Sequence, residues 1–387
     1  MIKSNDPFGW PVFNRHNPYK LRAFENTKRP VLLLFSDDST LFFCLRLRKL
    51  LQDCKTPHPI ELVWYMDESA LSYRQVSLLL PEGPDQYFTK GELTKVMRDP
   101  NIEAVITSRV YRPLQNLMAT QAHRLYGDRP CLIAFLGGLE FTPEKGYYNR
   151  RNCDAVYLFP QSALTTYRNK AVIWDNGWQE VGFGHPHFLM PKLAPTDLKS
   201  RKDIYFFTQA ISPLTKRSRL QMLKAMIAIA RGYPDRIVWI KLRHLPHENQ
   251  AHLHLEKHSY PDLLATLTDV PENLRLTACT MDEALETAAL GITCTSTAAI
   301  DVVRSGIPAM VYLDFVDNYR DPLMPPMRDL FETSGLITSL EDMLNLRTSS
   351  PNPEWVADMF CPRDLGERIF QTIERFKKRA FQLKPKP

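Results

Sequence analysis

Short runs of apolar residues alternate along the chain with longer stretches in which apolar residues recur at helical spacing. In the first half, the apolar runs predict strands at residues 31–35, 60–65, 104–107, 131–135, 155–158 and 171–174. The intervening stretches predict helices at residues 40–53, 68–80, 90–98 and 112–126. Such alternation of strands and helices is typical of a parallel sheet covered by helices.

A segment rich in proline and glycine, residues 182–200, interrupts this alternation and predicts a connection between domains. The alternation then restarts, with strands predicted at residues 204–208, 236–242, 274–278, 290–294 and 309–313. A last helix, residues 364–381, is long enough to pack back on the first domain. We therefore predict an α/β protein with two Rossmann-like domains, at residues 1–190 and 200–363, followed by a C-terminal helix and basic tail at residues 364–387.

The tightest unit of the chain is LGITCTSTAAIDVVRSGIPAMVYL, residues 290–313, which predicts a strand, a short helix and a second strand. Three hydroxyl residues, Thr295, Ser296 and Thr297, fall at the turn between the first strand and the helix. Free backbone N–H groups and the positive end of the helix dipole favour a phosphate at such a turn. The alternative is that Ser296 or Thr297 only caps the helix.

Composition narrows the class of protein. Of the 387 residues, 44% are hydrophobic and 24% are charged, as in ordinary globular proteins, and the seven cysteines show no paired spacing, which favours reduced thiols. No apolar window reaches about 18 residues and the N-terminal residues lack the apolar core of a signal peptide, so we expect a cytoplasmic protein. The net charge of +6 is spread along the chain, which argues against a nucleic-acid partner.

The basic residues gather in one place only, the last predicted helix, which contains RFKKRAFQLK at residues 375–384. A basic amphipathic helix of this kind can contact anionic lipid at the inner face of a membrane, so peripheral attachment is one expectation. The other is that these residues form a solvated helix end.

In the first half, polar residues follow two of the predicted strands. Asp37 and Asp38 come directly after the first strand, where a carboxylate can act as a general base toward an acceptor hydroxyl. Gly137 and Gly138 follow the strand at 131–135, allow close backbone approach and present Glu140. The alternatives are a helix cap at Asp38 or Ser39 beside a solvated Asp37, and a glycine turn with a surface glutamate.

In the second half, the first strand ends at Thr208 and Gln209, which offer a hydroxyl and an amide to a base or ribose. The next strand ends at Lys241, Arg243 and His244, where cations and an imidazole suit charge-assisted hydrogen bonds to phosphate. The alternatives are a polar strand end without a ligand and a solvated basic loop. Because strand ends meet at one edge of a parallel sheet, these residues and the Ser296–Thr297 turn predict one phosphate site.

Several site types are excluded by their missing motifs. Five histidines lie between residues 244 and 258, but they lack the spacing of a zinc helix and Pro246 breaks the helix that they would need. The chain also lacks an Asp-x-Asp triplet, a P-loop, a G-x-G-x-x-G fingerprint and a G-x-S-x-G elbow. We therefore expect no metal ion and no cofactor.

Two motifs resemble those of the GT-B glycosyltransferases: His244-Leu245-Pro246 at a strand end, and Thr295-Ser296-Thr297 followed by a small-residue helix and Gly306-Ile307-Pro308. More narrowly, the chain resembles bacterial sialyltransferases, polysialyltransferases and Kdo transferases, which use CMP-activated ulosonic acids. The resemblance implies two Rossmann-like domains that face a central cleft. It also implies that the His-Pro and Ser/Thr motifs bind the CMP phosphate, and that an acidic residue of the N-terminal domain is the base.

From these features we predict an inverting, metal-independent glycosyltransferase that moves a sugar from a CMP-sugar to a glycan acceptor. Asp37, Asp38, Glu140 and His244 are its candidate catalytic residues. Two alternatives remain open. One is a UDP-sugar transferase or a sugar-nucleotide 2-epimerase on the same fold. The other is a non-catalytic, two-lobed nucleotide-binding protein.

Overall fold

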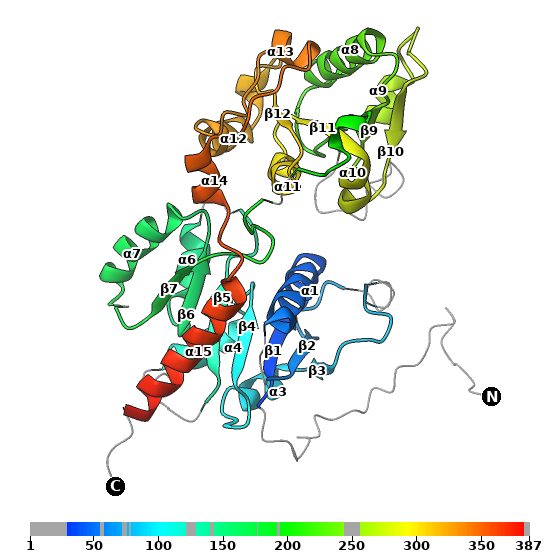
Figure 1. Cartoon of the computed structure of the whole chain (residues 1–387). Helices are drawn as coiled ribbons and strands as arrows, with labels where there is room; N and C mark the ends of the chain where they lie inside the picture. Colours follow the sequence, from blue (N-terminus) through cyan, green and yellow to red (C-terminus); the bar gives the residue numbers. More distant parts are fainter. Residues whose placement is uncertain are drawn as a thin grey trace, which may run out of the picture. The chain divides into compact units, whose positions relative to one another are not determined.

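The computed structural model describes residues 29–54, 58–71, 76, 79–120, 129–139, 143–175, 177–191, 194–243 and 256–382. By its internal contacts the chain divides into two compact units (Figure 1). The first unit consists of Met1–Leu189 and Cys361–Pro387, and the second consists of Met190–Phe360. Each unit contains its own sheet.

The first unit is built on a seven-stranded sheet whose strands pair in parallel in the order β3-β2-β1-β4-β5-β6-β7. The strands are β1 Val31–Phe35, β2 Ile60–Tyr65, β3 Gln86–Phe88, β4 Ala104–Thr107, β5 Cys131–Phe135, β6 Ala155–Leu158 and β7 Glu180–Phe183. The central strands are buried along their whole length, since helices cover both faces, and this explains their continuous apolar sequences.

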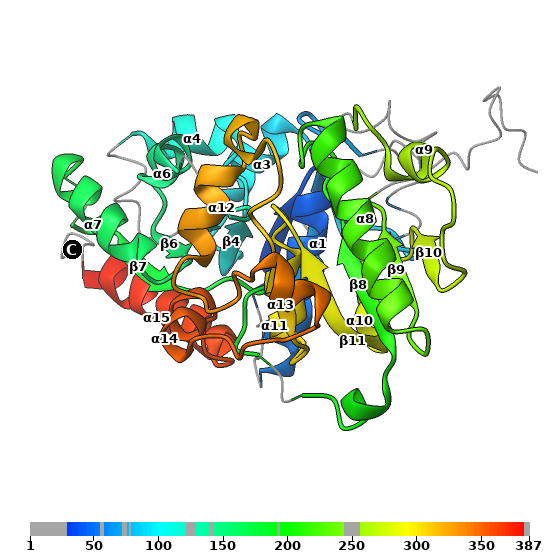
Figure 2. The ribbon, with the colours of Figure 1, turned by 90° about the horizontal axis from the view of Figure 1, so that it is seen from above.

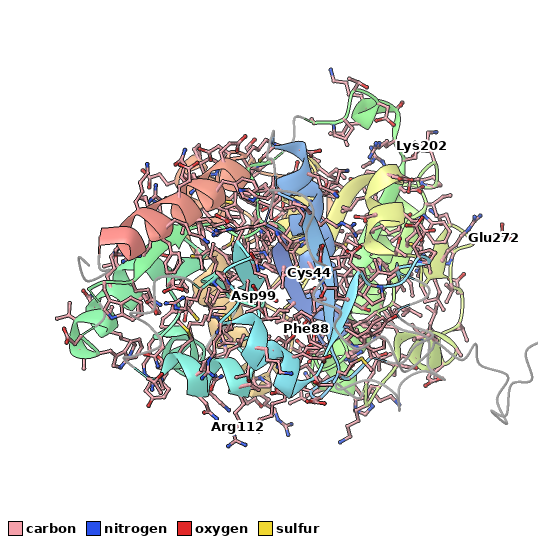
Figure 3. All side chains as sticks on the ribbon, turned by 90° about the horizontal axis from the view of Figure 1, so that it is seen from below. Cys44, Phe88, Asp99, Arg112, Lys202 and Glu272 are labelled. Carbon is pink, nitrogen blue, oxygen red and sulfur yellow. The ribbon has the colours of Figure 1, made fainter. Side chains whose placement is uncertain are left out.

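Helices pack on both faces of this sheet. They are α1 Asp38–Asp53, α3 Lys90–Val96, α4 Arg112–Met118, α6 Glu144–Arg150, α7 Ala163–Ile173 and α15 Leu365–Gln382. One apolar core contains residues of α1 and α15, and the core on the opposite face contains residues of α3 and α4. In Figure 3, Cys44 of α1 and Phe88 of β3 lie within the unit, and both are fully buried, whereas Arg112 points outward.

The second unit has a five-stranded parallel sheet in the order β10-β9-β8-β11-β12. Its strands are β8 Asp203–Phe207, β9 Val238–Lys241, β10 Leu274–Thr277, β11 Ala288–Thr293 and β12 Ala309–Val311. The helices are η1 Leu198–Ser200, α8 Lys216–Gly232, α9 Tyr260–Leu264, α10 Met281–Thr287, α11 Ala298–Arg304, η3 Asn318–Arg320, α12 Met324–Phe331, α13 Leu340–Leu344 and α14 Pro353–Met359. The long α8 packs on β9 and β10 (Figure 2).

Each sheet has one point at which the strand order reverses. In the first unit the chain builds β2 and β3 on one side of β1 and then places β4 on the other side. In the second unit β9 and β10 lie on one side of β8, and β11 lies on the other. Open α/β sheets bind their ligands at the carboxyl ends of the strands at such a reversal. We therefore expect ligands at the residues that follow β1 and β4 in the first unit, and at those that follow β8 and β11 in the second.

The predicted fold class, two parallel α/β domains, is confirmed, but two predicted elements are wrong and two strands were not predicted. Residues 171–174 are not a strand, because α7 continues to Ile173 and its apolar end, Val172 and Ile173, is about 80% exposed. The edge strands β3 and β7 were missed, since they are short and partly exposed and so lack a continuous apolar run. Residues 68–71 are not helical, and most of the rest of the helix predicted at 68–80 lies outside the described residues.

The last helix, α15, packs against the first unit as predicted. Its apolar side, with Leu365, Ile369 and Ile373, is buried in the same core as α1. Its basic side forms ion pairs, from Arg375 to Glu180 and from Lys377 to Glu103, the latter at 3.5 Å. The apolar surface on which the expected lipid contact depended is therefore occupied by protein. No helix among the described residues is both long and apolar enough to cross a membrane.

A buried ion pair links β5 to β6 beneath α15. The Arg129 guanidinium donates two hydrogen bonds to the Asp154 carboxylate, at 2.6 and 2.7 Å, and its Cζ atom lies 4.9 Å from the centre of the Phe376 ring. Asp154 also accepts from the backbone N–H of Leu132 at 2.8 Å. Because both side chains are nearly inaccessible, removal of one partner leaves the other charge buried and unpaired.

We expect the substitution Asp154→Ala to lower the free energy of unfolding by about 3–5 kcal/mol, as is typical when one member of a buried pair is removed. Urea unfolding followed by circular dichroism measures this change. The control is Lys202→Gln, which removes an exposed pair with Asp235 at 3.9 Å and is expected to cost less than about 1 kcal/mol. Equal losses in the two variants would contradict this assignment.

Candidate functional site

A pocket of about 260 Å³ opens at the carboxyl edge of the sheet in the second unit. It is lined by residues that follow β8, β9 and β11 together with the first turns of α10 and α11: Phe207, Thr208, Gln209, Lys241, Leu242, Arg243, Met281, Ser296, Thr297, Ala298 and Asp301. Six residues that the sequence predicted to bind substrate lie in this one pocket. The three strands bring them together because parallel pairing places their carboxyl ends at the same edge.

Hydrogen bonds fix the direction of two polar groups in the pocket. The Gln209 side-chain oxygen accepts from the backbone N–H of Ala210 at 2.9 Å and from Nη1 of Arg243 at 2.8 Å. These two donors identify that atom as the amide oxygen, so the NH₂ group of Gln209 keeps its hydrogens for another partner. The Thr208 hydroxyl donates to the carbonyl oxygen of Lys241 at 3.0 Å.

The pocket contains two cations, Lys241 and Arg243. Neither Lys241 nor Arg243 forms an ion pair within the described part of the chain. Burial lowers the pKa of the Lys241 ammonium from its ordinary value of 10.5, against the opposing effect of Cys279 and Glu283. Asp301, the one carboxylate among the described lining residues, pairs with Arg304 at 3.3 Å. The pocket is therefore rich in donors and positive charge, which suits a phosphate.

The three hydroxyl residues that follow β11, Thr295, Ser296 and Thr297, have different surroundings. Ser296 Oγ accepts from the backbone N–H of Ala298 at 3.2 Å, and Thr297 occupies the N-cap position without a capping bond from its side chain. Thr295 does not line the pocket, since it is buried and its hydroxyl donates to Oγ of Ser212. Helix α11 has only seven residues, so the hydroxyls and N–H groups of this turn matter more than the helix dipole.

Two buried charges hold the loop that follows β8, and sequence reasoning missed both. Asp321 accepts from the Ser212 hydroxyl at 2.6 Å and from the backbone N–H of Leu214 at 3.0 Å. Arg219 of α8 donates to the carbonyl oxygens of Ala210, at 2.5 Å, and of Pro213, at 2.8 Å. The position of Gln209 thus depends on side chains distant in sequence, which no local motif reveals.

In the first unit, Asp37 is the N-cap of α1. Its Oδ1 accepts from the backbone N–H of Thr40 and from the Ser39 hydroxyl, both at 2.8 Å, and Oδ2 pairs with Arg109 at 3.2 Å. Burial raises the pKa of the Asp37 carboxyl, but the donors of Thr40, Ser39 and Arg109 outweigh burial and lower it below 3.8. The cap is therefore Asp37 itself, not Asp38 or Ser39 as the alternative reading had it.

The other predicted residues are placed as follows. Asp38 is exposed in the first turn of α1. Gly137 and Gly138 follow β5, and a Cβ atom at Gly138 would meet no protein atom within 4 Å. Glu140 and His244 lie outside the described residues. The catalytic and binding roles of all these residues stay predictions.

Two charged residues at the strand ends of the first unit were not predicted from the sequence. Arg109 follows β4 and contacts Asp37 at 3.2 Å and Glu68 at 3.4 Å. Glu68 follows β2 and reaches the same edge of the sheet, because β2 and β4 flank β1. Because a helix was predicted to begin at Glu68, this residue was not recognised as one that follows a strand.

Among the described residues no group of three or more His, Cys, Asp or Glu side chains is arranged to bind a metal ion. Of the five histidines between residues 244 and 258, only His258 is described. The expectation of no metal therefore stays a prediction.

The sequence matches one known family, described as "Putative glycosyltransferase (DUF6716)", over residues 38–375. The chain belongs to this family. The predicted enzyme class, glycosyltransferase, is thereby confirmed at the level of the family. No curated protein matches the sequence.

Solved structures show the same fold. The UDP-GlcNAc 2-epimerase from Methanocaldococcus jannaschii is similar with a TM-score of 0.56 at 10% identity, over 90% of this chain and 99% of that one. A "putative UDP-N-acetylglucosamine 2-epimerase" from Listeria monocytogenes gives 0.50 at 14% identity, over 92% and 98%. MurG from Acinetobacter baumannii gives 0.44 at 14% identity, over 92% and 95%. At these identities the likeness concerns the fold alone.

The capping role of Asp37 predicts a pH-dependent contribution to stability. Because folding lowers its pKa, the contribution is present above the unfolded pKa of about 3.9 and is lost as the pH falls through the folded pKa. We expect Asp37→Ala to lower the free energy of unfolding by about 0.5–2 kcal/mol at pH 7. The difference from wild type should shrink below pH 4, as measured by urea unfolding at several pH values.

Asp38→Ala is the control for this experiment, since Asp38 is exposed, adds a charge to the first turn and accepts one exposed hydrogen bond from the backbone N–H of Ser39 at 2.8 Å. Its loss should be the smaller of the two. A loss at Asp37 that stayed constant from pH 7 to pH 2 would show that the carboxylate charge is not what stabilises the helix.

Proposed function

We propose that the second unit binds the nucleotide part of a sugar nucleotide and that the protein transfers the sugar to a hydroxyl of a glycan acceptor. The observation that supports this most directly is the pocket at the β8–β11 reversal, where Lys241 and Arg243 form no ion pair with a carboxylate of the described residues. Membership of a glycosyltransferase family supports the same reaction class.

In this proposal the phosphate lies among the donors of the pocket. Lys241 and Arg243 supply charge, Ser296 and Thr297 supply hydroxyls, and the NH₂ group of Gln209 points to an acceptor atom of the ligand. Phosphate oxygens only accept hydrogen bonds, so each of these donors finds a partner. His244 follows Arg243 in the chain and is proposed to join the phosphate contacts.

Such a site favours departure of the nucleotide. Negative charge grows on the phosphate oxygen as the glycosidic bond breaks, and fixed donors stabilise that charge more in the transition state than in the ground state. Two cations in the pocket supply part of what a magnesium ion supplies elsewhere. We therefore propose a metal-independent, inverting transfer that EDTA does not inhibit.

Two donor classes have separate support. The His-x-Pro-like and Ser/Thr motifs of this chain resemble those of enzymes that use CMP-activated ulosonic acids. Two structural neighbours, with TM-scores of 0.50 and 0.56, are named as a "putative UDP-N-acetylglucosamine 2-epimerase" and a UDP-GlcNAc 2-epimerase. A UDP-sugar is therefore the second candidate donor, and 2-epimerisation is the second candidate reaction. An epimerase forms product from the sugar nucleotide alone, whereas a transferase needs an acceptor.

We propose that the enzyme is cytoplasmic and that its donor is a cytoplasmic metabolite. We do not propose membrane contact through α15, because the apolar side of that helix is buried in the first unit.

Thermal-shift measurements with CMP, UDP, GDP and ADP, with and without EDTA, test the site and its base preference together. A ligand that binds only the native protein raises the melting temperature by mass action. We expect stabilisation by CMP or UDP that EDTA leaves unchanged. Absence of a shift with all four nucleotides would overturn the proposal. Binding without turnover of any sugar nucleotide would favour the non-catalytic alternative.

We expect Lys241→Met and Arg243→Met each to weaken binding of the stabilising nucleotide about ten- to a hundred-fold, since a hydrogen bond to a charged group contributes about 1.5–3 kcal/mol. Isothermal titration calorimetry measures the dissociation constants. The matched control is Lys224→Met, an exposed lysine of α8 outside the pocket lining. Unchanged affinity in both pocket variants would place the phosphate elsewhere.

A further inference from the structure

A cluster of three charged side chains lies at the strand reversal of the first unit. Arg109, which follows β4, has Asp37 on one side, with 3.2 Å between Nη1 and Oδ2. Glu68 lies on its other side, with 3.4 Å between Nη2 and Oε2. The three side chains are partly exposed, at 47% for Arg109, 19% for Asp37 and 30% for Glu68. The cluster carries a net charge of −1 where an α/β sheet binds a ligand.

Asp37 has little capacity left for a ligand. Its two oxygens accept from a backbone N–H and a hydroxyl at 2.8 Å and from Arg109 at 3.2 Å. Those donors lower its pKa, and a carboxylate stabilised in this way is a weak base. Its role in holding the start of α1 would also be lost if it moved toward a substrate.

Glu68 is bound much more loosely. From the described residues each of its oxygens accepts one long contact, Oε2 from Arg109 and Oε1 from the backbone N–H of Arg112, both at 3.4 Å. Protein N–H···O bonds are usually 2.7–3.2 Å long, so these contacts are weak. A carboxylate offers about four lone-pair positions. Glu68 can therefore accept a hydrogen bond from a ligand without giving up a strong one.

Polar groups beneath the cluster are also incompletely satisfied. The hydroxyls of Ser36, Ser108 and Tyr111 are buried and form no well-shaped hydrogen bond within the described part of the chain, although Ser36 is close enough to Tyr111 to oppose the rise in the pKa of Tyr111 that burial causes. Ser36 directly precedes Asp37, Ser108 directly precedes Arg109, and the Arg109 Cζ atom lies 5.8 Å from the centre of the Tyr111 ring. Buried polar groups in native proteins normally have partners, and a catalytic role or a bound water or ion is among the explanations of an exception.

From this geometry we propose that Glu68, rather than Asp37, binds the acceptor hydroxyl in the first unit and removes its proton, while Arg109 positions the Glu68 carboxylate. The inference rests on the proposed function. The acceptor O–H bond breaks and its proton moves to Glu68. The acceptor oxygen forms a bond to the anomeric carbon of the donor, and the bond from that carbon to the phosphate oxygen breaks, leaving its electron pair on the nucleotide.

The charge of the cluster also narrows the acceptor. Two carboxylates around one guanidinium, with the exposed Asp38 beside them, repel an acidic group at this point. The sugar ring that carries the attacking hydroxyl is therefore a neutral one.

The variant Glu68→Gln tests this assignment, since it keeps size and hydrogen bonding but cannot take up a proton. Release of CMP from CMP-N-acetylneuraminic acid and of UDP from UDP-N-acetylglucosamine is measured with water and with methyl galactoside as acceptors. We expect the kcat of the variant to fall about 100- to 10,000-fold, as is typical for loss of a general base. The dissociation constant of the free nucleotide should stay within about two-fold, because its pocket belongs to the second unit.

Glu82→Gln is the matched control, an exposed glutamate of the same unit that is expected to keep full kcat. Circular dichroism checks the fold of each variant. If Glu68→Gln is unfolded, Glu68→Asp replaces it, and we expect a smaller loss of kcat.

If Glu68→Gln keeps the kcat of the wild type, the Glu68 assignment is overturned and the proposed function is left intact. A wild-type protein that binds no nucleotide would overturn the proposed function itself. Nucleotide binding without release from either donor would also count against Glu68, because no proton would then be transferred.

Discussion

Parallel strand pairing is the constraint on which the rest of the structure depends. Every pairing in the two sheets is parallel, so all strands of a unit end at the same edge, and the connections between them must return across the helical layers. Polar residues that follow strands far apart in sequence are thereby collected at one line. The reversal of strand order then opens a gap between two connections at a defined point, between β1 and β4 and between β8 and β11.

The two edges differ in chemical character. In the second unit, Lys241 and Arg243 lie beside hydroxyls and an amide NH₂ group, and Asp301, the carboxylate among the described lining residues, pairs with Arg304. In the first unit, two carboxylates surround Arg109, and the balance is negative. One edge therefore suits a phosphate and the other suits hydroxyl groups. This division of charge matches the sugar nucleotide and the neutral sugar acceptor that we propose.

Much of this arrangement could be predicted from sequence, because buried parallel strands are continuous apolar runs and the polar residues that follow them are easily recognised. Six residues that line the pocket were found in this way: Thr208, Gln209, Lys241, Arg243, Ser296 and Thr297.

The features that could not be predicted depend on contacts between residues far apart in the sequence. Thr295 looks like its neighbours in sequence, yet its side chain turns inward to Ser212. Glu68 meets Arg109 only because β2 and β4 flank β1, and no spacing along the chain encodes that. The strand predicted at residues 171–174 is wrong for a different reason. Val172 and Ile173 are apolar, as in a buried strand, but both are exposed.

The position of α15 has a consequence for the order of events during protein synthesis. The core on one face of the first sheet includes Leu365, Ile369, Ile373 and Phe376, which are made after the entire second unit, Met190–Phe360. A nascent chain that has just completed the second unit therefore displays an uncovered apolar strip on the first. Domains generally fold as units while the chain grows, and exposed apolar surface favours aggregation in the interval. The second unit is thus positioned to mature ahead of the first, although the first is begun earlier.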